Sequence, residues 1–270
     1  MIKKILFDSK DKMKSAYLWN TCAAMLNAFQ TVFILMLISR IDPVIDAGVF
    51  TIAFAIGNLM MAIGKYGIRQ FQVSDVEEKY SFKEYTAARI VTSIIMIAAS
   101  FVYVGVNLTS GLYNSSKSIV IILICLAKVI DAVEDVIHGM FQQYLRLDVA
   151  GKILSIRMCT YIFVYLVCYY FSKNLILTSA VALLVSFIQF VILNYTAIRG
   201  FEIKKKAFKD LKRQYFKAVL ICFLFTIVFG NGYTFVTKIF PDETPKEIVT
   251  TVEKDKNNLK NKNRDEIRED

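Results

Sequence analysis

The chain has little of what catalytic and metal-binding proteins use. One of its 270 residues is a histidine, His138, and its five cysteines show no CxxC spacing. Neither a zinc site nor a disulfide framework is therefore indicated. A glycine-rich phosphate loop, a GxSxG elbow and an HExxH motif are all missing, and these patterns carry phosphate, acyl-transfer and metalloprotease chemistry. We expect no enzyme, no metal and no cofactor.

The apolar residues also lack the strict alternation of a membrane-barrel strand. They form 56% of the chain and gather into long blocks. A block of about twenty residues is long enough for a helix to cross a hydrocarbon layer of about 30 Å. The sequence therefore predicts an all-α, polytopic transmembrane helix bundle of six to seven helices. The expected spans are 16–39, 44–64, 86–106, 118–142, 155–171, 175–198 and 216–236.

Composition divides the chain around these spans. Residues 1–15 form an N-terminal segment, 16–200 a six-helix transmembrane bundle, 201–215 a basic loop and 216–240 a seventh transmembrane helix, interrupted by glycines. Residues 241–270 form a tail in which 16 of the last 30 residues are charged. Such a composition cannot bury a core, so we expect this tail to be disordered.

The net charge of +10 is not gathered into one basic domain, which argues against nucleic acid as a partner. Instead, 21 lysines and arginines lie in alternate connections, within 1–14, 65–89, 146–157 and 199–217. The other connections hold three, Arg40, Lys117 and Lys173. The positive-inside rule then places the N-terminus in the cytoplasm.

One apolar block, 118–142, is unusual because one of its faces is charged. Lys128, Asp131, Glu134, Asp135, His138 and Gln142 fall within an arc of about 120° on a helix. Exposing such groups to lipid costs about 2.5 to 3.5 kcal/mol each near the membrane centre. Two interpretations stay open. The charges could pair at i,i+3 and i,i+4, and with Arg89 or Arg157, to fasten the bundle, or they could line a cavity for a substrate or a coupling ion.

Two stretches carry a resemblance to a known family. The segment IGKYGIRQFQVSDVEEKYSFKEY, Ile63 to Tyr85, and the segment from Leu126 to Arg157 resemble the Wzx-type polysaccharide flippases. These belong to the multidrug/oligosaccharidyl-lipid/polysaccharide exporter superfamily. The resemblance covers about residues 15 to 200 and continues faintly to about 243, with His138 and Met158 in place of an expected tyrosine and glycine. The matching residues are Tyr66, Gly67, Arg69, Gln72, Asp75, 79–82, Tyr85, Arg89, Glu134, Asp135, Gly139, Gln142, Arg146, Asp148 and Arg157.

The resemblance implies one lobe of an exporter-type fold in the bacterial inner membrane. Its substrate would be a lipid-linked oligosaccharide, flipped from the inner to the outer leaflet by alternating access. Lys128, Arg89 and Arg157 are the expected partners of the substrate pyrophosphate. We assign Asp131, Glu134, Asp135 and His138 to an ion-coupling site or an ion-pair network, and Arg69, Gln72, Asp75, Arg146 and Asp148 to cytoplasmic loops.

Membrane lipid is one expected partner. Because relatives of this family have two lobes, a protein partner is expected as well. A second lobe from another chain, or a second copy in a homodimer, would complete an incomplete or split flippase. Two alternatives stay open: a truncated, non-transporting scaffold for polysaccharide synthesis, and half of a multidrug cation antiporter.

Overall fold

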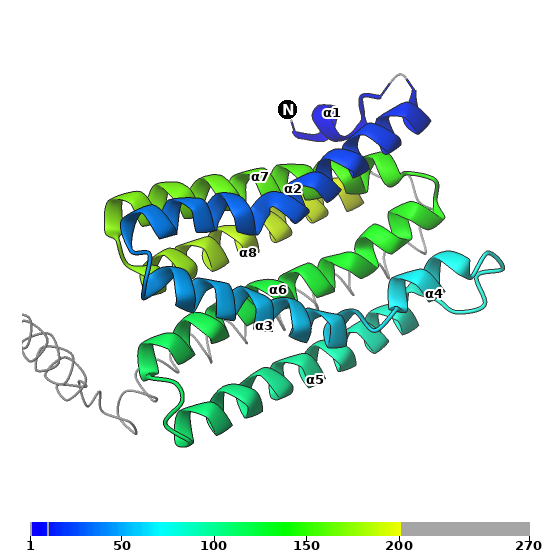
Figure 1. Cartoon of the computed structure of the whole chain (residues 1–270). Helices are drawn as coiled ribbons and strands as arrows, with labels where there is room; N and C mark the ends of the chain where they lie inside the picture. The colour runs from blue at the N-terminus through cyan, green and yellow to red at the C-terminus, as the bar shows by residue number, and fades with distance from the viewer. Residues whose placement is uncertain (1, 10, 201–270) are drawn as a thin grey trace, which may run out of the picture. The chain divides into compact units, whose positions relative to one another are not determined.

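The computed structural model describes residues 2–9 and 11–200, which belong to the first of two units of the chain, Met1–Tyr233. The expected basic loop 201–215, seventh helix 216–240 and tail 241–270 lie outside the described residues. Within the described part, eight helices and no strand are found (Figure 1). Their bounds are α1 Ile2–Phe7, α2 Lys12–Ile41, α3 Asp46–Lys65, α4 Ile68–Ser74, α5 Phe82–Thr109, α6 Ser115–Gln143, α7 Leu147–Ser172 and α8 Leu175–Gly200.

The long helices begin and end at recognisable local signals. Asp11 accepts hydrogen bonds from the backbone N–H groups of Met13 and Lys14, and so satisfies donors in the first turn of α2. Ser81 and Glu84 form a capping box at the start of α5. Lys173 ends α7 in the left-handed conformation, with φ 48°, which gives the tight turn into α8.

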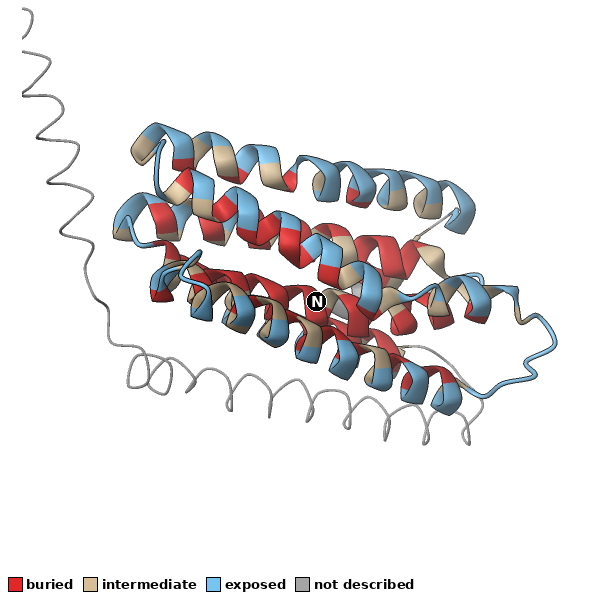
Figure 2. Cartoon of the chain, turned by 60° about the horizontal axis from the view of Figure 1, so that its bottom comes forward, coloured by how far each residue is buried: buried red, intermediate tan, exposed pale blue. Residues whose placement is uncertain are grey.

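The helices form two groups joined by α6. Helix α2 packs along α7, α7 packs along α8, and α3 and α5 pack against each other (Figure 1). Helix α6 contacts α3 and α5 on one side and α8 on the other, so it lies at the centre. Figure 2 shows buried residues along the inside of the bundle and exposed residues on its outer faces.

The outer faces are apolar, as expected for helices in contact with lipid. Exposed side chains of α5 include Val91, Ile94, Ile95, Val102 and Val106, and those of α8 include Leu177, Leu184, Ile188 and Ile192. Five segments of the described part are long and apolar enough to cross a membrane: α2, α3 with α4, α5, α7 and α8. These features confirm an all-α bundle of the transmembrane type, in a multi-pass membrane protein.

The structure differs from the expected spans at three places. Helix α7 begins at Leu147, well before the expected residue 155, because charged side chains in its first turns are buried rather than exposed in a loop. Two short helices, α1 and α4, lie in segments expected to be loops. Helix α6 is as long as the five apolar segments but carries too many charges to be counted with them.

Candidate functional site

Close packing of α3 brings the charged side chains of α6 into the core. A Cβ atom added to Gly57 would lie 3.0 Å from the Cγ2 atom of Ile124, and one added to Gly64 would lie 3.3 Å from the Cβ atom of Ala132. The absence of side chains at these two positions therefore lets α3 approach α6 closely. As a result α6 is buried around most of its circumference, and its uncharged face meets other helices rather than lipid.

The first charged cluster joins α6 to α7 and α8. The Nζ atom of Lys128 lies 3.6 Å from Oδ2 of Asp131, and Nη2 of Arg157 donates a hydrogen bond to Oδ1 of Asp131. The same Arg157 nitrogen lies 2.9 Å from Oε2 of Glu134. Asn194 of α8 donates from Nδ2 to Oε1 of Glu134 at 2.7 Å. Two cations and two carboxylates thus form a balanced cluster in an apolar bundle.

His138 lies beside this cluster without a close partner. Its Nε2 atom is 4.0 Å from Oε1 of Glu134 and forms no hydrogen bond with the described residues. The side chain is 4% exposed, one turn beyond Glu134 on α6. The i,i+3 spacing therefore brings Lys128 and Asp131 into contact, whereas the i,i+4 spacing leaves His138 and Glu134 as neighbours without a hydrogen bond.

The second charged cluster lies around Asp135, nearer the end of α6. Arg89 of α5 contacts Oδ2 of Asp135 at 2.8 Å, and Arg69 of α4 contacts Oδ1 at 3.3 Å. Arg89 is fully buried and also donates to the carbonyl oxygens of Gly64 and Lys65, at 2.6 and 2.8 Å. It thereby satisfies carbonyl groups at the end of α3 that the helix itself leaves free. Sequence spacing could not reveal this, because the groups come from four different segments.

The residues expected in the first cytoplasmic loop belong in part to a helix. Arg69 and Gln72 lie on α4, and Gln72 is fully buried against α6. Gln143 donates to the backbone oxygen of Gln72 at 2.7 Å, and Arg69 donates to Oε1 of Gln142 at 2.9 and 3.2 Å. These contacts hold α4 against the end of α6.

Asp75 is the one expected loop residue of this group that lies in a loop. Its carboxylate accepts hydrogen bonds from the Tyr85 hydroxyl at 2.6 Å and from the N–H groups of Lys79 and Tyr80, both at 2.9 Å. These hydrogen bonds stabilise the charged carboxylate and so lower the pKa of Asp75, and the bond from Tyr85 has the largest effect. The carboxylate therefore organises the connection from α4 to α5.

Arg146 and Asp148, also expected in a loop, sit at the start of α7. They form a two-bond ion pair, with distances of 2.9 and 3.1 Å, and Asp148 is fully buried. Nearby, Lys152 donates to the carbonyl oxygens of Ile5 and Leu6 and to the Ser9 hydroxyl, at 3.0, 3.2 and 2.8 Å. Lys152 was not among the expected site residues, because nothing in its sequence neighbourhood indicates that the N-terminal helix α1 lies against it.

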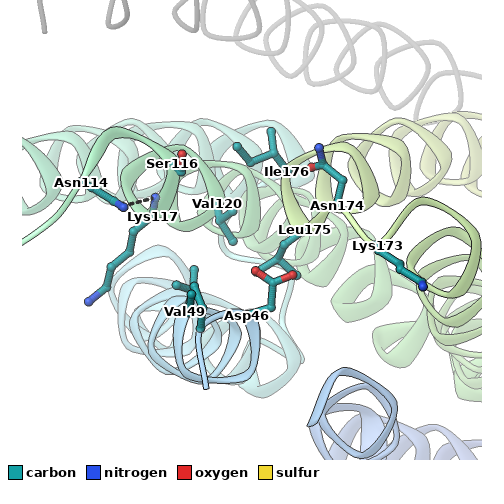
Figure 3. A pocket seen from close by; sticks show the side chains of 11 residues that line it. Asp46, Val49, Asn114, Ser116, Lys117, Val120, Lys173, Asn174, Leu175 and Ile176 are labelled. Atoms are coloured by element: carbon teal, nitrogen blue, oxygen red, sulfur yellow. Dashed lines mark hydrogen bonds between the residues drawn. The ribbon is translucent and has the colours of Figure 1, made fainter. Parts of the chain in front are cut away.

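Three hollows of very different size lie along α6. Lys128, Asp131 and Arg157 border a space of about 10 Å³, which is room for a single water molecule. A pocket of about 620 Å³ lies where α3 and α4 meet the end of α6, with Lys65, Arg69 and Asp135 in its lining. The third, of about 210 Å³, lies at the beginning of α6 (Figure 3), where Asp46, Lys117 and Asn174 line it.

The expected substrate cations are therefore all engaged in the described conformation. Lys128, Arg89 and Arg157 are each 3% exposed or less and each contacts a carboxylate. No group of three or more histidine, cysteine, aspartate or glutamate side chains is placed to hold a metal ion within 2–9 and 11–200. The arrangement can hold charge inside a membrane. Of the three hollows along α6, the two near its ends have room for a ligand larger than water.

Comparisons with protein-family models, with curated proteins and with solved structures find no match to this chain.

Proposed function

We propose that this chain is one helical lobe of a transporter that flips a lipid-linked oligosaccharide across the bacterial inner membrane, with its N-terminus in the cytoplasm. The observation that carries the proposal is the balanced cluster of Lys128, Asp131, Glu134 and Arg157 in the centre of an apolar bundle. Apolar side chains of similar size would fasten the helices at equal or lower free energy. Retaining four charges there supports a role beyond packing.

The cluster also supplies a way to bind an anionic substrate. In the described conformation Arg157 contacts both Asp131 and Glu134, so it can reach a pyrophosphate only after these ion pairs open. Helix α6 has few contacts with α7, the helix that carries Arg157, whereas α7 packs extensively on α2. A shift of α7 with α2 away from α6 would expose Arg157 and Lys128 together, as alternating access requires.

The second candidate is a non-transporting scaffold. It is favoured by the small size of the central space, about 10 Å³, and by the engagement of every expected substrate cation. A cluster of this kind could serve only to hold α7 and α8 onto α6.

A reconstitution experiment separates the two candidates. We expect the strictly monomeric chain in liposomes to leave a lipid-linked oligosaccharide in its original leaflet, because in the two-lobed transporters that the chain resembles the substrate site lies between the lobes. With a second lobe or a second copy in the same liposome, a reagent added outside should reach the sugar. Transport by the monomer would refute the need for a partner, and no transport in any assembly would favour the scaffold.

A further inference from the structure

The pocket at the junction of α3, α4 and α6 has more positive than negative side chains in its lining, unlike the balanced central cluster. Lys65, Arg69 and Asp135 line the pocket, and Asp135 is contacted by Arg69 and by the buried Arg89. Lys65 forms no ion pair within 4.0 Å among residues 2–9 and 11–200. The central cluster, by contrast, holds two cations and two carboxylates. Two arginines therefore share the single carboxylate of Asp135, and Lys65 adds a further positive charge to the pocket lining.

The pocket is built by a sharp turn rather than left open by chance packing. Tyr66 and Gly67, with φ 36° and 65°, both take the left-handed conformation between α3 and α4. After this turn α4 packs against α6, and Arg69 and Lys65 line the same pocket. Arg69 is then fixed by hydrogen bonds to Gln142 and Asp135, so its guanidinium is already positioned.

Hydrogen-bond donors remain available in this pocket. Arg69 has five N–H groups and the described contacts use three, which leaves two. The ammonium of Lys65 adds up to three donors, and the lining also holds the polar side chains of Gln70 and Ser74. The volume of about 620 Å³ is in the range of ligand sites, and a polar lining with surplus cations suits an anion with several acceptor oxygens.

We propose that this pocket binds a phosphate group, held by Lys65 and Arg69, at the end of α3. Because Lys65 is the last residue of an apolar, membrane-length helix, the pocket lies at the depth of lipid headgroups. A phosphate in this position comes either from an anionic phospholipid or from a soluble phosphate compound, and both present the same oxygens. The site is separate from the central cluster and does not rest on the chain being a transporter.

Native mass spectrometry of the full chain tests the lipid source. The protein is purified in mixed phosphatidylglycerol and phosphatidylcholine, and the retained lipids are counted. We expect one phosphatidylglycerol to be retained preferentially, and Lys65→Gln to weaken this retention about tenfold, since a charge-assisted hydrogen bond is lost. Lys117→Gln, which removes the same charge from the pocket at the other end of α6, should leave it unchanged.

The soluble source is tested with inorganic pyrophosphate titrated onto the chain in phosphatidylcholine nanodiscs. Saturable binding that Lys65→Gln weakens and Lys117→Gln does not would support a soluble phosphate ligand. Because Arg69 also holds Asp135, Arg69→Lys, which keeps the charge, accompanies Arg69→Gln to separate anion binding from folding. Retention of neither probe, or equal losses in Lys65→Gln and Lys117→Gln, would overturn the proposal.

Discussion

At the scale of single residues, the two buried arginines of residues 2–9 and 11–200 are each paired with a carboxylate from another helix. Arg89 contacts Asp135 and two carbonyl oxygens, and Arg157 contacts two carboxylates. Such groups are expensive to bury unless their hydrogen bonds are made. The spacing on α6 was enough to predict its internal pairs, but the contacts of Asn194 and Lys152 depend on packing between distant segments and could not be read from the sequence.

Asp75 provides a prediction about pH. Its pKa is lowered in the folded chain, so the contribution of its carboxylate to loop order is fully present above the unfolded pKa of about 3.9 and is lost as the pH falls through the lower folded value. Hydrogen exchange at the Lys79 and Tyr80 amides, corrected for intrinsic rates, should therefore stay slow from pH 7 to about pH 4 and accelerate below that. Asp75→Asn should show fast exchange across the whole range. Equal protection in the two proteins at pH 6 would contradict this role.

At the scale of helices, the long apolar runs predicted six elements to within a few residues at most ends. The start of α7 was missed because Asp148 and Lys152 resemble loop residues until their buried partners are known. Helices α1 and α4 were missed because they are short, and short helices take their stability from packing rather than from their own sequence.

The contact between α2 and α7 depends on Gly151. A Cβ atom there would lie 2.9 Å from the backbone nitrogen of Asn20 and 3.0 Å from the carbonyl carbon of Trp19, and backbone atoms cannot move aside. Gly151→Ala should therefore lower the free energy of unfolding by about 1 to 3 kcal/mol. Gly105→Ala on α5 has no atom within 4 Å of the added group and serves as the matched control. Thermal unfolding in detergent compares them, and similar midpoints for both variants would count against close packing at Gly151.

The docking of α1 depends on Lys152. Lys152→Met keeps the length of the side chain but removes its bonds to Ile5, Leu6 and Ser9, which leaves two carbonyl groups at the end of α1 unpaired. We expect a cysteine placed at Leu6, which is fully buried, to react much faster with a water-soluble maleimide in this variant. An unchanged labelling rate would show that α1 is held by its apolar contacts alone.

At the scale of the whole molecule, the bundle combines a lipid-facing exterior with a charged interior. The sequence predicted the class of fold because only helices and closed barrels can span lipid, and the apolar blocks lack the alternation of barrel strands. It did not predict how closed the interior is, because the size of a cavity depends on how side chains from α2, α6, α7 and α8 fit together. The described conformation leaves about 10 Å³ beside Lys128, so the proposed transport requires a second arrangement of these helices.

The most direct test of the proposed role compares transport and stability in Glu134→Gln, in the partnered assembly. The substitution keeps the shape of the side chain and an oxygen that can accept from Asn194, and Arg157 retains Asp131. We predict nearly unchanged folded yield and thermal midpoint, together with loss of oligosaccharide transport. Asp135→Asn is the contrasting variant, because it leaves the buried Arg89 without its carboxylate and should cost about 3 to 5 kcal/mol of stability. Full transport by Glu134→Gln, or a collapse of its folded yield, would contradict the account.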